Sequence, residues 1–498
     1  NGICQLFPAV QIFIVGNVQP HRCNAIQQLR LRGRIRQNRA DLLPLFQVCR
    51  VSILLIPAQP ILQSHHTLGG AAVDPTDLRF PPLPVKCPLL RNLGQVQQLL
   101  AQALAYQKKL DADCPFTDPV ARWLARSADA YISRRDSTGE KTILAGYPLF
   151  SDWGRDTMIA LPGCCLATGR YADAKSILKT FLAYEKDGLV PNLFPEGESQ
   201  PMYNTVDAAL LLIDSLWQYV RRTGDVQFVR EAWPVMERII ANYRKGTHHH
   251  IGMDEDGLIF AGGGLDQVTW MDVCVNGILP TPRHGKPVEI NAYWYNALRI
   301  MDALAAELSL DGKDYAVLAE QVKASFCEKF YMEDKGYLKD VLSGTSADDQ
   351  LRCNQIWAVS MPFTMLSPEQ ERSVVETVFR HLYTPCGLRT LSPEDPEYHP
   401  TYGGPQVERD MAYHQGTTWV FPMGAYYLAY LKVNGYSQEA ARYVRRQMAA
   451  LESMMAEGCM GQLPEIYDGQ FPGEGKGCFA QAWSVGEMLR VFEALERK

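Results

Sequence analysis

Two kinds of predicted helix alternate through most of this chain, and this alternation limits the folds open to it. The segment 206–220, VDAALLLIDSLWQYV, is apolar on nearly every face. The next segment, 225–243, has apolar residues at a spacing of three or four, with charged residues opposite them. A helix of the first kind needs burial on both sides, and a helix of the second kind can cover it. The pattern therefore favours an all-α fold in which outer helices surround inner ones.

Helical periodicity continues from Leu89 almost to the end of the chain, with Pro234 as a kink or restart inside one segment. Short turns such as 223–225 and 434–436 would join consecutive helices as antiparallel hairpins. We therefore expect a toroid of alternating inner and outer helices. After a helix at 93–110, twelve are expected: at 118–133, after Arg155, at 171–185, 205–222 and 225–243, from near 289, from near 313, at 351–363 and 368–383, after His414, at 437–454 and at 478–496.

The first part of the chain differs in composition from the rest. Asp41 is the only acidic residue before Asp74, and the first glutamate of the chain is Glu140. Neither helical nor alternating periodicity persists there. We expect residues 1–87 to be an atypical segment, disordered or non-native, and residues 88–498 to form the functional domain.

Composition excludes several classes of function. A net charge of −6 on 498 residues argues against nucleic acid or an anionic membrane as the main partner. The 13 cysteines are odd in number and include no Cys-x-x-Cys pair, which predicts reduced thiols and a cytoplasmic protein. No apolar run reaches the roughly 18–20 residues of a membrane span, and no signal peptide is expected.

Five segments rich in glycine, aromatic residues and carboxylates lie before even-numbered helices of the series of twelve. In an inner and outer alternation, such loops would all open at the same end of the toroid. Long loops in a compact domain are usually functional. We therefore expect a pocket at one mouth, formed by residues 146–156, 191–204, 262–289, 398–416 and 462–477.

Two of these loops carry carboxyl groups suited to glycoside hydrolysis. Asp272 closely follows Trp270, and Glu465 lies in the last loop. Hydrolysis needs one protonated carboxyl for the leaving oxygen and one ionised carboxylate for water or direct attack. Asp272, between Met271 and Val273, fits the acid because poor hydration raises the pKa of a carboxyl; Glu465 fits the base. Either residue alone could instead be a surface or capping carboxylate.

The residues Trp153 to Asp156, Trp-Gly-Arg-Asp, stand directly before an apolar helical run. An aromatic face and an Arg/Asp pair can grip a sugar, and a helix start directs N–H groups at whatever lies in front of it. The alternative is a structural ion pair that caps the helix. His248 to His250 are adjacent residues without ligands at metal-binding spacing, so we expect a solvated loop there and no bound metal.

Eight motifs, in order, identify a family that this chain resembles. From about Ala121 to Arg490 the chain resembles the amylo-α-1,6-glucosidase module of glycogen debranching enzymes of archaeal and bacterial type, which is related to glucoamylases. The motifs are AGYPLFSDWGRDTMIALPG, GLVPNLFPEG, YNTVDAALLLI, TWMD, GKPVEINAYWYNAL, YHQGTTWVFPMGA, LPEIYDG and QAWSVGEMLR.

This resemblance implies an (α/α)6 barrel and inverting hydrolysis of α-1,6-linked glucose at the branch points of glycogen or a limit dextrin. It implies Asp272 as general acid and Glu465 as general base, with no cofactor. Residues implied to bind the glucose or line its pocket are Trp153, Arg155, Asp156, Asn204, Asp207, Trp270, Glu289, His414, Gln415 and Trp483. The oligomeric state is left open.

Two alternatives and two departures accompany this interpretation. The chain could be another inverting (α/α)6 glycosidase, glucoamylase-like or trehalase-like, or a non-catalytic glucan-binding protein. Residues 1–86 do not resemble the β-rich domain that precedes the barrel in bacterial and archaeal members, and the eukaryotic transferase module is not matched. The family's usual Trp-Pro-Trp reads Trp419-Val420-Phe421 here, which indicates a different subsite wall.

Overall fold

The computed structural model describes residues 93–195, 200–471 and 473–496. The prediction for residues 1–87 lies outside these residues. The chain divides into two units at Asp113, and the helix α2 (Leu93–Asp113) belongs to the first of them. The second unit begins at Cys114 and contains all the candidate site residues.

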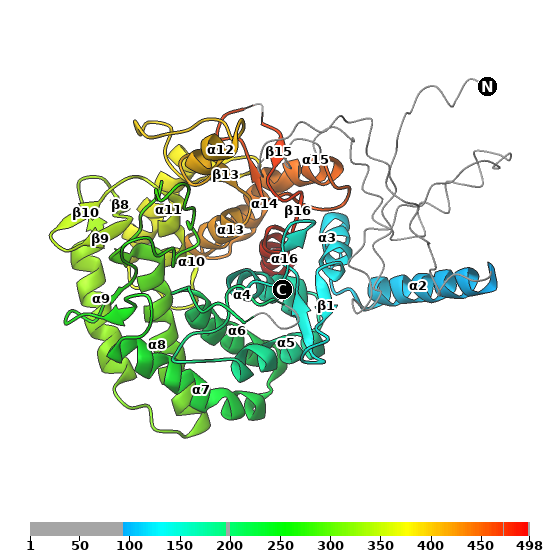
Figure 1. Cartoon of the computed structure of the whole chain (residues 1–498), viewed down its shortest axis with the longest axis horizontal. Helices are drawn as coiled ribbons and strands as arrows, with labels where there is room; N and C mark the ends of the chain where they lie inside the picture. Colours follow the sequence, from blue (N-terminus) through cyan, green and yellow to red (C-terminus); the bar gives the residue numbers. More distant parts are fainter. Residues whose placement is uncertain (1–92, 196–199, 472, 497–498) are drawn as a thin grey trace, which may run out of the picture. The chain divides into compact units, whose positions relative to one another are not determined.

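Six helices of the second unit form a closed ring (Figure 1). Each packs against the next in the series, and the last packs against the first. They are α4 (Gly154–Leu161), α6 (Ala208–Thr223), α8 (Val288–Leu308), α10 (Trp357–Ser360), α13 (Pro422–Val433) and α16 (Ala482–Glu496).

A second set of helices packs outside this ring. Each contacts at least one ring helix: α3 contacts α16, α5 contacts α6, α7 contacts α6 and α8, α9 contacts α8, and both α11 and α14 contact α13. Burial follows the predicted contrast, since α6 is buried without interruption from Ala208 to Leu216 whereas α7 buries one face. The outer helices are α3 (Pro119–Asp129), α5 (Tyr171–Ala183), α7 (Val226–Lys245), α9 (Tyr315–Phe330), α11 (Pro368–Leu382) and α14 (Gln438–Gln447).

The ring closes through a contact between two glycines. A π-helical turn, Pro162–Ala167, follows α4 and packs against α16. A Cβ on Gly163 would lie 1.7 Å from the carbonyl oxygen of Gly486. Only glycine at position 163 permits this approach of the two backbones, so the turn after α4 packs directly against the last ring helix.

Several elements differ from the prediction. The eighth predicted helix is a 3₁₀ turn, Cys353–Ile356, followed by the short α10. The eleventh is divided into α14, a 3₁₀ turn (Met448–Ala450) and α15 (Leu451–Ala456). An unpredicted helix, α12 (Gln406–Ala412), lies in the loop 398–416, and α4 begins before Asp156.

Short strands in the loops also depart from an all-α fold. Five of them form one antiparallel sheet in the order β11-β12-β13-β14-β15, and Glu465 directly precedes β14. Because these strands have only two or three residues, periodicity does not reveal them. The sheet consists of β11 (Tyr383–Thr384), β12 (Gly387–Arg389), β13 (Thr418–Trp419), β14 (Ile466–Tyr467) and β15 (Gly475–Lys476). The other strands are β1 (Ile132–Arg134), β2 (Lys141–Ile143), β3 (Gly146–Tyr147), β4 (Gly252–Met253), β5 (Ile259–Phe260), β6 (Lys286–Pro287), β7 (Tyr331–Met332), β8 (Tyr337–Leu338), β9 (Val341–Ser343), β10 (Ser346–Asp348) and β16 (Ala480–Gln481).

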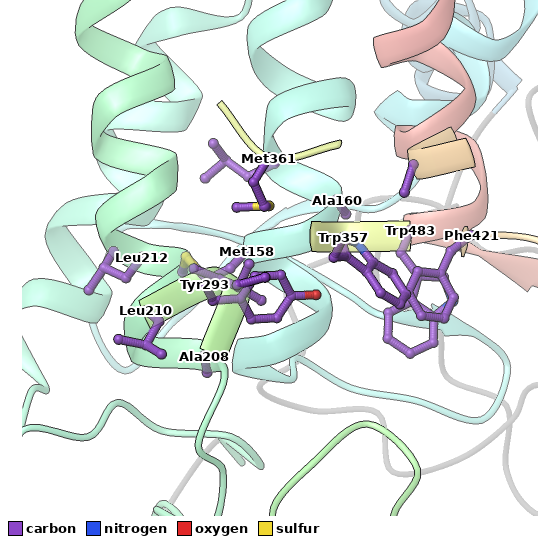
Figure 2. Packing of buried hydrophobic residues seen from close by; sticks show 14 of the residues in the cluster. Met158, Ala160, Ala208, Leu210, Leu212, Tyr293, Trp357, Met361, Phe421 and Trp483 are labelled. Carbon is purple, nitrogen blue, oxygen red and sulfur yellow. The ribbon is translucent and has the colours of Figure 1, made fainter. Parts of the chain in front are cut away.

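Aromatic side chains fill the core near the starts of the ring helices. Figure 2 shows Trp357, Phe421 and Trp483 close together. Phe421 and Trp483 stack with ring centroids 4.2 Å apart, and Trp357 lies 5.6 Å from Phe421. In the described part of the chain, the helices are all too short or too polar to traverse a lipid bilayer.

Candidate active site

The predicted mouth loops are joined by hydrogen bonds. Gly154 donates to the carbonyl of Asn192 at 2.7 Å, which connects the first loop to the second. The Gln415 amide donates to the Pro280 carbonyl at 2.8 Å, which connects the fourth loop to the third. The loops therefore meet, as the alternation of inner and outer helices predicts.

Arg155 is the central cation of this site. Its Nε donates to Asp207 Oδ2 at 2.6 Å, and its Nη1 donates to Asp272 Oδ2 at 3.0 Å. The side chains of Arg155 and Asp207 are 3% and 4% exposed, whereas that of Asp272 is 36% exposed. Arg155 thus forms its ion pairs with residues of two other loops, not with the adjacent Asp156 that the sequence suggested. One guanidinium fixes two carboxylates by its fork geometry.

Asp156 lies in the first turn of α4, directly after Arg155, the residue that bonds to Asp272. Gln481 Nε2 donates to its Oδ1 at 3.4 Å. Burial raises the pKa of Asp156 to about 8; Arg155 opposes this rise, and the charges of Asp272 and Glu465 add to it. Because both of those charges act on Asp156, the three carboxyls form one electrostatically coupled cluster.

Glu465 is buried and held at both carboxylate oxygens. The Tyr413 hydroxyl donates to Oε1 at 2.6 Å, and the Cys478 backbone N–H donates to Oε2 at 2.8 Å. Burial raises the pKa of Glu465 to about 7, the two hydrogen bonds oppose the rise, and the charge of Asp272 adds to it. A carboxyl that titrates near neutrality can exchange protons with substrate or water.

Asp272 differs from Glu465 in what surrounds it. Burial raises its pKa, Arg155 counters this through charge and a hydrogen bond, and the charge of Asp207 raises the pKa again. Its side chain is 36% exposed, whereas Glu465 is 3% exposed. The two predicted catalytic groups therefore sit in one cluster but in different environments.

Several buried polar atoms near these carboxyls have no hydrogen-bond partner among the described residues. Burial and the charges of Arg352, Arg155 and Arg283 lower the pKa of His414 well below its usual value. Such atoms are suited to bind sugar hydroxyls, because unpaired burial costs about 1–3 kcal/mol per group. They are Asn204 Oδ1, Asp207 Oδ1, both ring nitrogens of His414, Trp483 Nε1 and Gln481 Oε1.

Comparison with known families assigns the chain to one of them. The sequence profile described as amylo-alpha-1,6-glucosidase matches residues 126–490, most of the chain. The chain belongs to the amylo-alpha-1,6-glucosidase family. It is therefore a glycoside hydrolase.

A curated relative and solved structures agree with this family. The glycogen debranching enzyme of Saccharomyces cerevisiae is 26% identical over 489 residues, which cover 74% of this chain but 31% of that protein. The chain thus spans about a third of that relative's length. The mannosylglycerate hydrolase of Thermus thermophilus in complex with glucose is similar in structure, with a TM-score of 0.54 and 17% identity over 75% of this chain and 99% of that one. The same hydrolase in complex with Tris has a TM-score of 0.53 and 15% identity with the same coverage. At these identities, the likeness concerns the fold alone.

Two of the pocket residues implied for this glycosidase have protein partners at all their side-chain polar atoms. Both oxygens of Glu289 accept hydrogen bonds from Arg283, which also binds Asp340. The Gln415 oxygen accepts from Arg352 at 2.6 Å, while its amide binds Pro280. Their contact with a sugar remains a prediction; in the structure they tie the loops together.

The predicted aromatic residues occupy different depths in this glycosidase. Trp270 is buried, donates through Nε1 to Asn354 at 2.7 Å and lies edge-on to Trp419. Trp153 is half-buried, with Phe150 edge-on at 6.3 Å. Trp153 is therefore the more accessible aromatic surface, and Trp270 supports the chain just before Asp272.

Sequence reasoning missed Tyr413 and the Cys478 backbone N–H. Tyr413 adjoins the predicted His414, but nothing in the sequence places its hydroxyl against residue 465. His248 to His250, expected in a solvated loop, bond to Asp187 and Asp266. The described residues include no group of three or more side chains arranged to hold a metal ion.

Proposed function

We propose that this protein hydrolyses α-1,6-linked glucose at the branch points of glycogen or a limit dextrin, with inversion at the anomeric carbon. The observation that carries this proposal is the single cluster containing Asp272 and Glu465 within a chain of the amylo-alpha-1,6-glucosidase family. The name of the yeast relative supports the choice of a glycogen-type substrate.

In this mechanism Asp272 is the general acid. Arg155 holds its Oδ2, so Oδ1 carries the proton to the glycosidic oxygen. The C–O bond to the leaving glucan breaks as that oxygen is protonated. The proposal requires a raised pKa for Asp272, and burial supplies it despite the opposing charge of Arg155.

Glu465 is the general base. Each of its oxygens accepts one hydrogen bond and retains a lone pair for a water proton. The activated water attacks the anomeric carbon from the face opposite the leaving group. Inversion needs a separation of roughly 6.5–9.5 Å between the two carboxyl groups, which leaves room for that water.

The substrate glucose would be held by the residues around these carboxyls. Trp153 offers an accessible ring face, and Asp156 accepts hydroxyl hydrogen bonds. The unpaired atoms of Asn204, His414 and Trp483 supply further donors and acceptors. No cofactor is needed in this mechanism.

We propose that the six ring helices and the six outer helices together form an (α/α)6 barrel. The active site of this barrel lies at the N-terminal ends of the ring helices. The nine cysteines in the described part of the chain are all unpaired, which suits a reducing compartment such as the cytoplasm.

A substrate panel tests the proposed specificity. Glucose release would be measured from a phosphorylase limit dextrin, isomaltose, maltose and trehalose, and mannose release would be measured from mannosylglycerate. Preference for the limit dextrin and isomaltose supports branch-point hydrolysis. Preference for maltose, trehalose or mannosylglycerate contradicts it, and glucan binding without release of any sugar favours a non-catalytic protein.

A further inference from the structure

Tyr413 makes the shortest contact to the candidate base. It follows α12 directly, is half-buried and donates its hydroxyl hydrogen to Glu465 Oε1 at 2.6 Å. At this distance the bond falls in the range of hydrogen bonds between a hydroxyl and a charged carboxylate. The bond therefore favours the ionised form of Glu465.

Tyr413 and Glu465 are anchored to the same pair of strands. Trp419 donates through Nε1 to the Tyr413 carbonyl at 2.9 Å. In the sheet, Trp419 pairs with Ile466, the residue after Glu465. The Val420 N–H also donates to the Glu465 carbonyl at 3.2 Å. The Trp419 side chain and the backbone pairing of the two strands thus hold Tyr413 and Glu465 near each other.

The ring of Tyr413 is also fixed by its aromatic neighbours. Its centroid lies 4.8 Å from those of His414 and Trp419 and 5.4 Å from that of Tyr402. These contacts restrict rotation of the phenol away from Glu465. A side chain held in this way loses little entropy when it keeps its hydrogen bond.

We propose that Tyr413 is a positioning residue that orients the Glu465 carboxylate and keeps it ready to accept a proton from water. The proposal rests on the proposed function, in which Glu465 is the base. Tyr413 acts through Glu465 and does not itself take part in bond breaking.

Other groups around Glu465 cannot replace this hydroxyl. The charge of Asp272 favours protonation of Glu465, and the Cys478 N–H holds the other oxygen. Titratable groups whose charge interacts with Glu465 are Asp156, Asp272, Tyr402, Tyr413 and Cys478. Among these groups of the described chain, Tyr413 alone donates a side-chain hydrogen bond to Glu465.

The variant Tyr413→Phe tests the proposal through the pH profile of kcat/KM. Loss of a hydrogen bond to a charged group should raise the pKa of Glu465 by about one unit. Since a base must be ionised, the acidic limb should move to higher pH by the same amount. We expect kcat below the limb to fall about tenfold while KM changes little.

Tyr427→Phe is the matched control. It removes a tyrosine hydroxyl that bonds to Tyr383 at 3.1 Å, inside α13 and away from Glu465. Its acidic limb should coincide with that of the wild type. If Tyr413→Phe also leaves the acidic limb of kcat/KM in place, the proposal is wrong. If the basic limb shifts instead of the acidic one, Glu465 is not the base.

Two further measurements separate this proposal from the proposed function. Carbon-13 NMR of labelled glutamate, with Glu465→Gln to assign the signal, follows the titration of Glu465 without any substrate. An unchanged titration midpoint in Tyr413→Phe overturns the proposal even if no sugar is hydrolysed. If Tyr413→Phe fails to fold, a fluorinated tyrosine can be placed at position 413 instead. Because its hydroxyl is a stronger hydrogen-bond donor, it should move the titration midpoint of Glu465 to lower pH. An unchanged midpoint overturns the proposal.

Discussion

Arg155 Nη1 lies 3.0 Å from Asp272 Oδ2, so a residue in the first turn of the first ring helix also holds the candidate acid. The same guanidinium bonds to Asp207, the residue before α6. Two helix starts and one catalytic loop are therefore fixed by a single side chain.

Arg155→Lys should separate these two contacts. A lysine has no fork, so it can pair with the buried Asp207 but not with Asp272 as well. We expect the pKa of Asp272 to rise, the basic limb of kcat/KM to move up by about one pH unit, and kcat to fall about 10- to 100-fold. The control Arg283→Lys breaks a buried fork to Glu289 and Asp340 and should leave that limb in place. A basic limb that stays fixed in Arg155→Lys would argue against Asp272 as the acid.

The two catalytic roles can be distinguished with a substrate whose leaving group needs no proton. On a limit dextrin, Asp272→Asn and Glu465→Gln should each lower kcat by about 10²- to 10⁴-fold. On α-glucosyl fluoride, Asp272→Asn should recover most of its rate, whereas Glu465→Gln should not. Initial rates of fluoride release provide the measurement. As a control, Glu474→Gln replaces an exposed carboxylate in the same loop as Glu465 and should behave as wild type. Recovery by Glu465→Gln instead would exchange the two roles.

His414 and Gln415 are adjacent, but we expect opposite effects from replacing them. His414 has unpaired ring nitrogens and stacks on Trp419 at 5.3 Å, so His414→Phe should keep the fold and lower kcat/KM about tenfold. Gln415→Leu removes bonds to Arg352 and Pro280 and should cost about 1–3 kcal/mol of stability. Thermal unfolding and steady-state kinetics of both variants test this contrast. A destabilised His414→Phe with normal kcat/KM would contradict it.

Burial of Glu465 should reduce stability as the pH rises. Its pKa is about 7 when folded, against an ordinary value of 4.5. Between pH 4.5 and pH 7, Glu465 has released its proton in the unfolded chain but keeps it in the folded chain. The wild-type protein is therefore most stable with respect to this residue at low pH, and its free energy of unfolding falls as the pH rises to about 7. We expect Glu465→Gln to gain about 3 kcal/mol relative to wild type between pH 4.5 and 7. Its amide can still donate to the Tyr413 oxygen.

Urea unfolding at several pH values measures this difference. The variant Glu452→Gln replaces an exposed carboxylate on α15 and should show a constant difference from wild type. If the advantage of Glu465→Gln does not grow with pH, Glu465 is not buried with a raised pKa.

The helices could be predicted from local sequence features. That the loops lie together could then be predicted from the alternation of inner and outer helices. Ser367 caps α11 with a full capping box, and Asp225 caps α7 by accepting from the Phe228 N–H, so these starts are visible in sequence. The helix α12 was missed because Glu408 and Asp410 look like a solvated charge run. The ring itself depends on contacts that only the fold reveals, such as Gly163 against Gly486.

The candidate site was predictable in its carboxyls but not in its partners. Asp272 and Glu465 stand in motifs, whereas the partner of each is distant in sequence: Arg155 lies 117 residues from Asp272, and Tyr413 lies 52 residues from Glu465. No periodicity encodes such pairs. The same reason explains why the arginine partners of Glu289 and Gln415 were not foreseen.

The anomer of the first glucose released tests the central claim most directly. Wild-type protein would be mixed with a phosphorylase limit dextrin, and the anomeric proton signals would be followed by NMR before mutarotation equalises them. Inversion at an α-1,6 linkage with Asp272 and Glu465 as acid and base should give β-glucose first. Initial release of α-glucose would contradict the account, because retention requires a nucleophile in place of the base.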